Sequence, residues 1–214
     1  MDSLYSVLHR GPEASASGAP LLVLLHGYGS NEEDLLGLAP YLDPRLVCIS
    51  ARAPHVLPFG GYAWFEIEWS EEGIRFDYEQ AWDAVQRIAD FVAELRHQHQ
   101  PEQIALAGFS QGAIMALTLA LRQPSEFVGA AALSGTCGEE MLPTEPESVR
   151  GLPIFMAHGR QDEIIPIEQA RAARDLLQAL PVDLSYLEYD MGHAIDAECL
   201  ADWRQWLSGR LTSA

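Results

Sequence analysis

The stretch QIALAGFSQGAIMALTLALR, residues 103–122, joins a strand pattern to a helix pattern with almost nothing between them. Its first six residues form a short apolar run, which is typical of a strand covered on both faces. Residues 111–122 are apolar on nearly every side, as expected of a buried helix. At the junction, Gly108 and Gly112 flank Ser110 in the pattern Gly-x-Ser-x-Gly. The stretch therefore predicts a parallel α/β fold with a sharp turn at the serine.

Such a turn has a chemical use. A chain that passes from strand to helix within about two residues strains the serine backbone and lifts the hydroxyl out of the sheet. The backbone N–H of Gln111 then points to the same region and can stabilise an oxyanion. The five-residue pattern alone is weakly specific, because glycine and serine are common. Its place between a buried strand and a buried helix makes Ser110 a candidate nucleophile.

Apolar runs and helical patterns alternate along the rest of the chain. Further buried strands are expected at 21–27, 45–50, 126–135, 152–159 and 182–189. Amphipathic or buried helices are expected at 78–99, 111–122, 168–180 and 196–211. Near-continuous apolar strands indicate a mostly parallel sheet, and alternation with helices predicts three layers. With no repeat and no linker, residues 1–214 are expected to form a single domain.

Composition excludes several classes of function. The net charge is −18, and all 13 basic residues are arginine. A phosphate-binding loop of the Walker type and Schiff-base catalysis both need a lysine, so neither is expected. The acidic surface would repel a phosphate backbone, so nucleic acid is not an expected partner.

The cysteines and the apolar runs indicate where in the cell the protein is expected. Cys48, Cys137 and Cys199 are widely spaced and form no CxxC pair, so neither a metal site nor a redox motif is predicted. The run LLVLL at 21–25 is too short and too late for a signal peptide, and no stretch approaches the roughly 20 apolar residues of a membrane span. We expect a cytoplasmic protein without stable membrane insertion, metal or cofactor.

A nucleophilic serine needs a base, and the base needs an orienting carboxylate. In sheets with this turn the chain order is serine, acid, histidine, each after the carboxyl end of a strand. His193 is the histidine that follows both Ser110 and a strand. Asp162 follows the strand at 152–159, although Glu163 and Asp190 compete with it for the role of the acid.

Two upstream segments complete the candidate site. The loop HGYG at 26–29 follows an early strand, so the backbone N–H of Tyr28 is the candidate second oxyanion donor, with a plain glycine turn as the alternative. Residues 53–73 hold five aromatic side chains without a helical or strand period. This cluster is either a local core or the wall of an apolar pocket, and composition alone leaves both open.

The motifs HGYG, GFSQG, HGRQDEIIP and MGH, in this order, resemble the phospholipase/carboxylesterase branch of the α/β-hydrolases over nearly the whole chain. The resemblance implies an α/β-hydrolase fold and a Ser110, Asp162, His193 triad, with the N–H groups of Tyr28 and Gln111 as the oxyanion hole. The branch often has leucine where Tyr28 stands, and this exchange keeps the backbone donor. The run GGYAW resembles the family's aromatic segment beside the site.

The expected function is hydrolysis of carboxylic esters or thioesters through an acyl-enzyme. Trp64, Phe65 and Ile164 are the candidate substrate-lining residues. Since no long insertion follows Gly135, we expect no large lid and short to medium acyl chains. The alternatives are a ligand-binding protein with little turnover and a serine hydrolase of another class, such as a peptidase. Ester, thioester, lysophospholipid and acylated protein all fit one triad, and the oligomeric state stays open.

Overall fold

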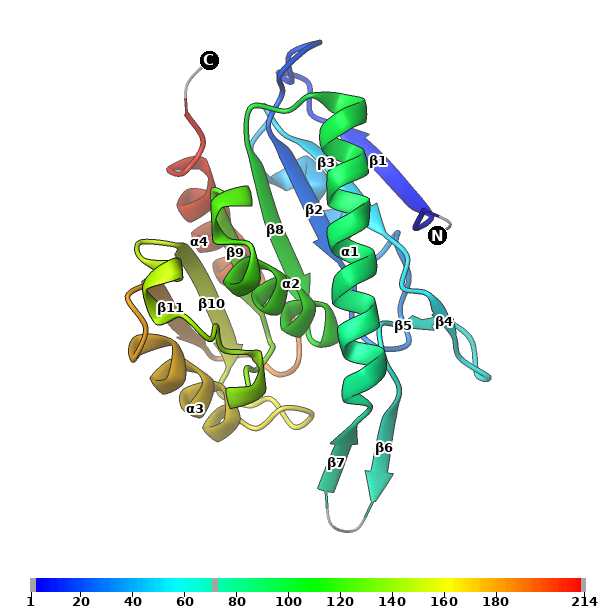
Figure 1. Ribbon diagram of the computed structural model, residues 1–214, viewed down its shortest axis with the longest axis vertical. Coiled ribbons are helices and arrows are strands. Elements are labelled where there is room, and N and C mark those ends of the chain that lie inside the picture. Colours follow the sequence, from blue (N-terminus) through cyan, green and yellow to red (C-terminus); the bar gives the residue numbers. More distant parts are fainter. Residues whose placement is uncertain (1–2, 71–72, 213–214) are drawn as a thin grey trace.

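The computed structural model describes residues 3–70 and 73–212. A seven-stranded sheet lies at the centre, in the order β1-β3-β2-β8-β9-β10-β11 (Figure 1). Its strands are β1 (Ser6–Arg10), β2 (Leu21–Leu25), β3 (Val47–Ala51), β8 (Ile104–Phe109), β9 (Gly129–Leu133), β10 (Pro153–Gly159) and β11 (Asp183–Tyr189). Only β1 runs antiparallel to its neighbour in this sheet, so the expectation of a mostly parallel sheet is confirmed.

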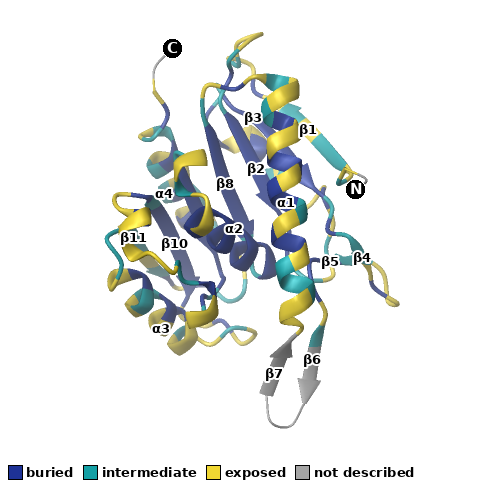
Figure 2. Ribbon diagram, viewed as in Figure 1, coloured by how far each residue is buried: buried dark blue, intermediate teal, exposed yellow. Residues whose placement is uncertain are grey.

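Helices cover both faces of the sheet. Residues of α1 (Tyr78–His99), α2 (Gln111–Arg122) and α3 (Ile167–Gln178) pack into one buried cluster with the side chains of one sheet face. A second cluster on the other face contains residues of α4 (Ala197–Ser208) and of the 3-10 helix η1 (Leu35–Tyr41). Alternate residues of β2 contribute to the two clusters, which is why this strand is apolar throughout. Figure 2 shows the central strands buried between exposed helix faces.

The helix bounds follow local signals. Helix α1 begins after Asp77, whose side chain accepts a hydrogen bond from the Gln80 N–H, and it ends at Gln100 in the left-handed conformation. Four helices lie within two or three residues of the sequence-based expectation, and so do the starts of the six apolar strands. None of the helices in the described part of the chain is long and apolar enough to cross a bilayer.

Strand structure also occurs where the sequence predicted none. Strand β1, an edge strand of mixed exposure, was not expected. The aromatic segment at 53–73, read as irregular, contains β4 (His55–Val56) paired with β5 (Tyr62–Ala63) and the start of a hairpin made by β6 (Ile67–Ser70) and β7 (Gly73–Phe76). That reading is wrong, because strands of two to four residues are too short to show a period.

The parallel strands bring the candidate residues to one edge. Strands β2, β8, β9, β10 and β11 run side by side and parallel, so the residues that follow them meet at the lower edge of the sheet in Figure 1. The β6–β7 hairpin projects beyond this edge next to the start of α1. Parallel sheets place their sites at the carboxyl ends of the strands, which is where the candidate site lies.

Candidate active site

Ser110 occupies the strained turn between β8 and α2. Its backbone has φ 54° and ψ −116°, outside the regions that residues with side chains prefer, and its N–H donates to the Leu133 carbonyl at 2.9 Å. The two flanking glycines are required by packing. A Cβ on Gly108 would collide with the carbonyl of Gly112, and one on Gly112 would collide with the carbonyl of Leu25.

Asp162 and His193 are in direct contact. The Nδ1 of His193 lies 2.7 Å from Oδ2 of Asp162, while Oδ1 accepts the backbone N–H groups of Ile164 and Ile165 at 2.9 Å each. The carboxylate is fully buried, and the imidazole is 18% exposed. Because an ionised carboxylate only accepts hydrogen bonds, His193 carries its proton on Nδ1, which leaves Nε2 free to act as a base.

The competing acids lie elsewhere. Asp190 pairs with Arg160 at 2.8 Å and is 80% exposed. Glu163 is exposed, and no ion pair or side-chain hydrogen bond joins it to His193. The geometry therefore selects Asp162 among the three carboxylates that the sequence left open.

A second histidine, His158, contacts the same carboxylate. Its Nε2 lies 3.3 Å from Oδ2 of Asp162 and 2.8 Å from the Ile165 carbonyl, and its side chain is fully buried. Because the Ile165 carbonyl can only accept, the proton of His158 is on Nε2. No sequence pattern assigned a role to this residue. The HG pair at the end of β10 was its only signal, and such pairs also occur as ordinary turns.

Packing and hydrogen bonds hold the His193 loop. The ring of Phe109, the residue before the nucleophile, lies 4.8 Å from the imidazole between centroids. Ser134 at the end of β9 donates from its hydroxyl to the Ala194 carbonyl at 3.1 Å. Three neighbouring strand ends thus set the position of His193.

The turn after β2 lies against the nucleophile. A Cβ on Gly27 would be only 3.3 Å from the Cβ of Ser110, so the 26–29 turn and the serine are in close contact. His26 is fully buried and braces this turn. Its Nδ1 donates to the Gly27 carbonyl at 2.8 Å, and its Nε2 accepts the Ala53 N–H at 3.1 Å. Burial lowers the pKa of His26, which keeps it neutral in this role.

Gln111 has a side-chain role that sequence reasoning missed. Its Oε1 accepts the Trp64 N–H at 2.8 Å, and its Nε2 donates to the Phe65 carbonyl at 2.7 Å. The first residue of α2 thus clamps the aromatic segment beside the nucleophile. No local pattern could reveal this contact, because the partners are more than 40 residues apart in the chain.

An open cleft of about 270 Å³ connects these elements. Ser110, His193, Tyr28 and Gln111 line it, together with Ile67, Ile114, Thr136, Ile164, Ile165 and Gln169. The three expected substrate-lining residues are placed differently. Ile164 lies in the cleft and is 50% exposed. Trp64 is fully buried, and its indole donates to the His26 carbonyl at 2.9 Å, so it supports the 26–29 turn instead.

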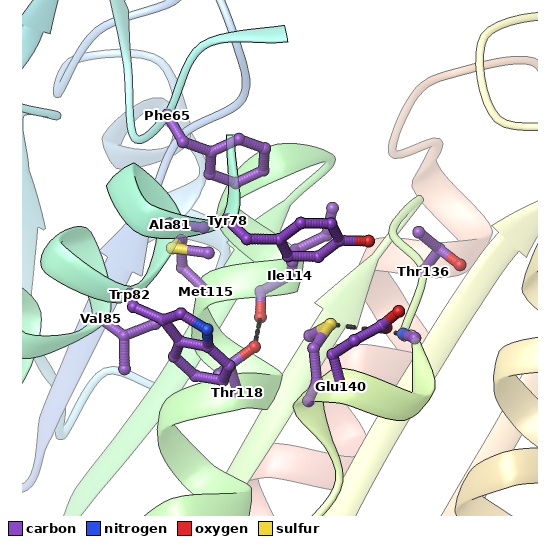
Figure 3. A pocket seen from close by; sticks show the side chains of 12 residues that line it. Phe65, Tyr78, Ala81, Trp82, Val85, Ile114, Met115, Thr118, Thr136 and Glu140 are labelled. Carbon is purple, nitrogen blue, oxygen red and sulfur yellow. Dashed lines mark hydrogen bonds between the residues drawn. The ribbon is translucent and has the colours of Figure 1, made fainter. Parts of the chain in front are cut away.

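Phe65 lies in a second, apolar cavity next to the cleft (Figure 3). It is also part of the main buried cluster. The aromatic segment therefore combines the two alternatives left open by its composition, because Trp64 and Phe65 belong to the core and Phe65 also forms a cavity wall. By contrast, Phe59 is 72% exposed.

Comparisons with known proteins show the family and the fold of the chain. The model of the Phospholipase/Carboxylesterase family matches residues 12–210. Acyl-protein thioesterase 1 of Kluyveromyces lactis is 30% identical over 209 residues, covering 89% of this chain and 92% of that protein. Esterase PE8 has a TM-score of 0.79 at 27% identity, covering 98% of this chain and 100% of that one. For the Bacillus cereus carboxylesterase the TM-score is 0.83 at 23% identity, with 97% and 95% covered, which is a likeness of fold.

Proposed function

The chain belongs to the phospholipase/carboxylesterase family and is a serine hydrolase of ester or thioester bonds, and we propose that Ser110, His193 and Asp162 carry its reaction. The observation that supports this assignment most strongly is the 2.7 Å contact between His193 Nδ1 and the buried Asp162 carboxylate, at a cleft that also exposes Ser110. Of the described carboxylates, this one combines burial with a contact to the histidine of the cleft.

The reaction begins with attack by the serine oxygen on the acyl carbonyl. His193 Nε2 takes the hydroxyl proton, and the Asp162 carboxylate stabilises the imidazolium that forms. The imidazolium then returns the proton to the leaving alcohol or thiol, and an acyl-enzyme remains on Ser110. Water enters, His193 removes its proton, and the acid is released while the serine regains its hydrogen.

We assign the oxyanion hole to the backbone N–H groups of Tyr28 and Gln111. Gln111 is the first residue of α2, so its N–H has no acceptor within the helix. Tyr28 lies in the turn that contacts Ser110, and both residues line the cleft. Two such donors, fixed before the substrate arrives, stabilise the negative charge on the carbonyl oxygen.

The proposed substrates carry an apolar acyl group of short to medium length. The cleft has isoleucines at 67, 114, 164 and 165. An alcohol, a thiol or a protein side chain can serve as the leaving group, since the cleft is open to solvent. We also propose a cytoplasmic location, in keeping with the three unpaired cysteines.

The test is hydrolysis of p-nitrophenyl butyrate and labelling by a fluorophosphonate probe. Ser110→Ala removes the nucleophile, and we expect loss of labelling and a fall in kcat of at least about 1,000-fold. His193→Ala should also abolish labelling. Ser148→Ala, which changes an exposed serine, serves as the control and should behave like the parent protein. Full turnover in a folded Ser110→Ala variant would contradict the assignment.

A further inference from the structure

His158 stands where the pattern of strand β10 calls for an apolar side chain. Met156 and Ile154, which precede it on the same strand, are fully buried in the cluster that β10 shares with α3. Because strand residues alternate between the two faces, His158 continues this row, and its side chain is also fully buried. A buried polar ring loses its hydrogen bonds to water, so its presence in this row calls for an explanation.

The imidazole of His158 uses only one of its two nitrogens. Nε2 donates to the Ile165 carbonyl at 2.8 Å and lies 3.3 Å from Oδ2 of Asp162. Nδ1 is buried and has no hydrogen-bond partner among the residues that the structure describes. Such a nitrogen costs stability, and a phenylalanine ring would fill the same space without this cost. Packing alone therefore does not explain the histidine, whereas its Nε2–H group does.

Three residues form a closed triangle of contacts around the acid. Ile165 donates its N–H to Oδ1 of Asp162 at 2.9 Å and accepts the His158 N–H at its carbonyl, while Nε2 of His158 faces Oδ2. Both carboxylate oxygens are thus contacted from inside the protein, and the group cannot rotate without breaking one of these contacts. The 2.7 Å contact between Oδ2 and His193 Nδ1 depends on this orientation.

We propose that His158 is a positioning residue of the triad, which holds the Asp162 carboxylate in the orientation that serves His193. This inference rests on the proposed function, because it assigns a role in the reaction of Ser110. His158 acts without touching the substrate, since it is fully buried and is not one of the described residues that line the cleft. The orientation of the carboxylate keeps the proton of His193 on Nδ1 and so presents Nε2 to the serine hydroxyl.

Two substitutions at position 158 separate the hydrogen-bond donor from the volume of the ring. His158→Phe keeps a ring and removes the N–H, so we expect kcat for p-nitrophenyl butyrate to fall about 10- to 100-fold, with KM changed by less than about twofold. His158→Gln places an amide N–H near the position of Nε2 and should restore kcat to within about threefold of the parent value.

His9→Phe is the matched control for the loss of an imidazole. His9 is half-buried on β1, which lies on the other side of the sheet centre from β10 (Figure 1), so kcat and KM should stay at the parent values. Thermal unfolding checks for a general defect. His158→Phe exchanges one unpartnered polar atom, Nδ1, for another, the Ile165 carbonyl oxygen, so its midpoint should stay within about 4 °C of the parent.

A double-mutant cycle shows whether His158 acts through the acid. Asp162→Ala alone should lower kcat strongly, measured after subtraction of the rate of Ser110→Ala. Adding His158→Phe to Asp162→Ala should lower kcat by less than about twofold further, because the group that His158 positions is already gone. A histidine that only supported the fold would instead multiply the two losses.

The proton between His193 and Asp162 gives a second readout, which a purely structural role would not change. Its low-field proton NMR signal arises from the short contact to the charged carboxylate. The signal should be absent in Asp162→Ala and weakened or shifted in His158→Phe. It should be retained in His158→Gln and in His9→Phe.

The outcomes separate this proposal from the assignment of the nucleophile. If folded His158→Phe keeps the parent kcat, or if its effect is the same with and without the Asp162 carboxylate, His158 does not position the acid. Ester hydrolysis that depends on Ser110 would still stand in that case. If no ester is hydrolysed in a Ser110-dependent way, the proposed function itself fails.

Discussion

At the scale of single residues, the candidate site is a set of close approaches around Ser110. Its strained backbone, with a positive φ, is possible because Gly108 and Gly112 let α2 start directly against β8 and the end of β2. The carboxylate of Asp162 is also closely surrounded, because two backbone N–H groups and two histidines contact it. Small changes of side-chain volume in this region must therefore move the nucleophile or its partners.

Gly112→Ala tests this dependence. The added Cβ would collide with the carbonyls of Leu25 and His26, so we expect α2 to shift and the free energy of unfolding to fall by about 3 kcal/mol. Urea unfolding measures the loss, and kcat for a butyrate ester should fall with it.

Gly37→Ala is the matched control for that experiment. An added Cβ would meet nothing within 4 Å, and the residue is exposed, so the substitution should leave activity unchanged and stabilise by about 0.5 kcal/mol. Equal effects of the two substitutions would show that crowding at the turn is unimportant.

At the scale of elements, the site depends on how the segment after β5 is joined to α2. The Gln111 side chain bonds to the backbone of Trp64 and Phe65, while the indole of Trp64 bonds to the His26 carbonyl. The nucleophile turn, the 26–29 turn and one wall of the apolar cavity are thereby linked. The proposed oxyanion role of Gln111 uses only its backbone, so the two roles can be separated by mutation.

Gln111→Ala keeps the backbone N–H and removes the clamp. Two buried backbone groups lose their partners, so we expect a loss of about 1–3 kcal/mol in unfolding free energy. Because the clamp holds the segment beside the nucleophile, kcat for a butyrate ester should also fall. Thermal unfolding and kcat for this ester are the measurements.

Gln86→Ala on α1 gives the comparison for the clamp. Its amide donates to the exposed Asp90 side chain at 2.9 Å, so little change is expected in either measurement. A Gln111→Ala variant as stable and as active as the parent would contradict the clamp.

At the scale of the whole molecule, we expect the net charge to affect how charged substrates approach the cleft. The net charge of −18 produces a negative field that weakens the approach of anionic substrates. Screening over about 8 Å at physiological ionic strength reduces this effect without removing it at short range. The field changes the rate at which a charged substrate reaches the enzyme, and it leaves the rate of the chemical step unchanged.

A pair of esters with the same acyl chain isolates this effect. We expect kcat/KM for 4-sulfophenyl butyrate, which carries its charge on the leaving group, to be about tenfold below that for phenyl butyrate at 10 mM salt. The gap should narrow at 500 mM salt, because screening shortens the range of the field. If the ratio of the two kcat/KM values does not depend on salt, contacts within the cleft and not the field cause the preference for the neutral ester.

Much of this architecture could be predicted from local patterns. Strand β8 and helix α2 carry continuous apolar runs, and α1 shows its period over 22 residues. Residues at the ends of parallel strands must meet at one edge, so Ser110, Asp162 and His193 could be named together. The short strands at 55–56 and 62–63 could not be predicted, because two residues carry no period.

The sequence by itself determined the alternation of six apolar strands with four helices, the strained turn at Ser110 and the candidate partners at two later strand ends. Only the tertiary structure decided that Asp162 and not Asp190 meets His193, and that the Gln111 side chain holds the aromatic segment. It also decided that Trp64 supports a turn while Phe65 faces a cavity. The physical reason is the separation of the interacting residues along the chain. Periodicity and turn chemistry act between near neighbours in the chain, whereas these contacts join residues that are 31 to 47 positions apart.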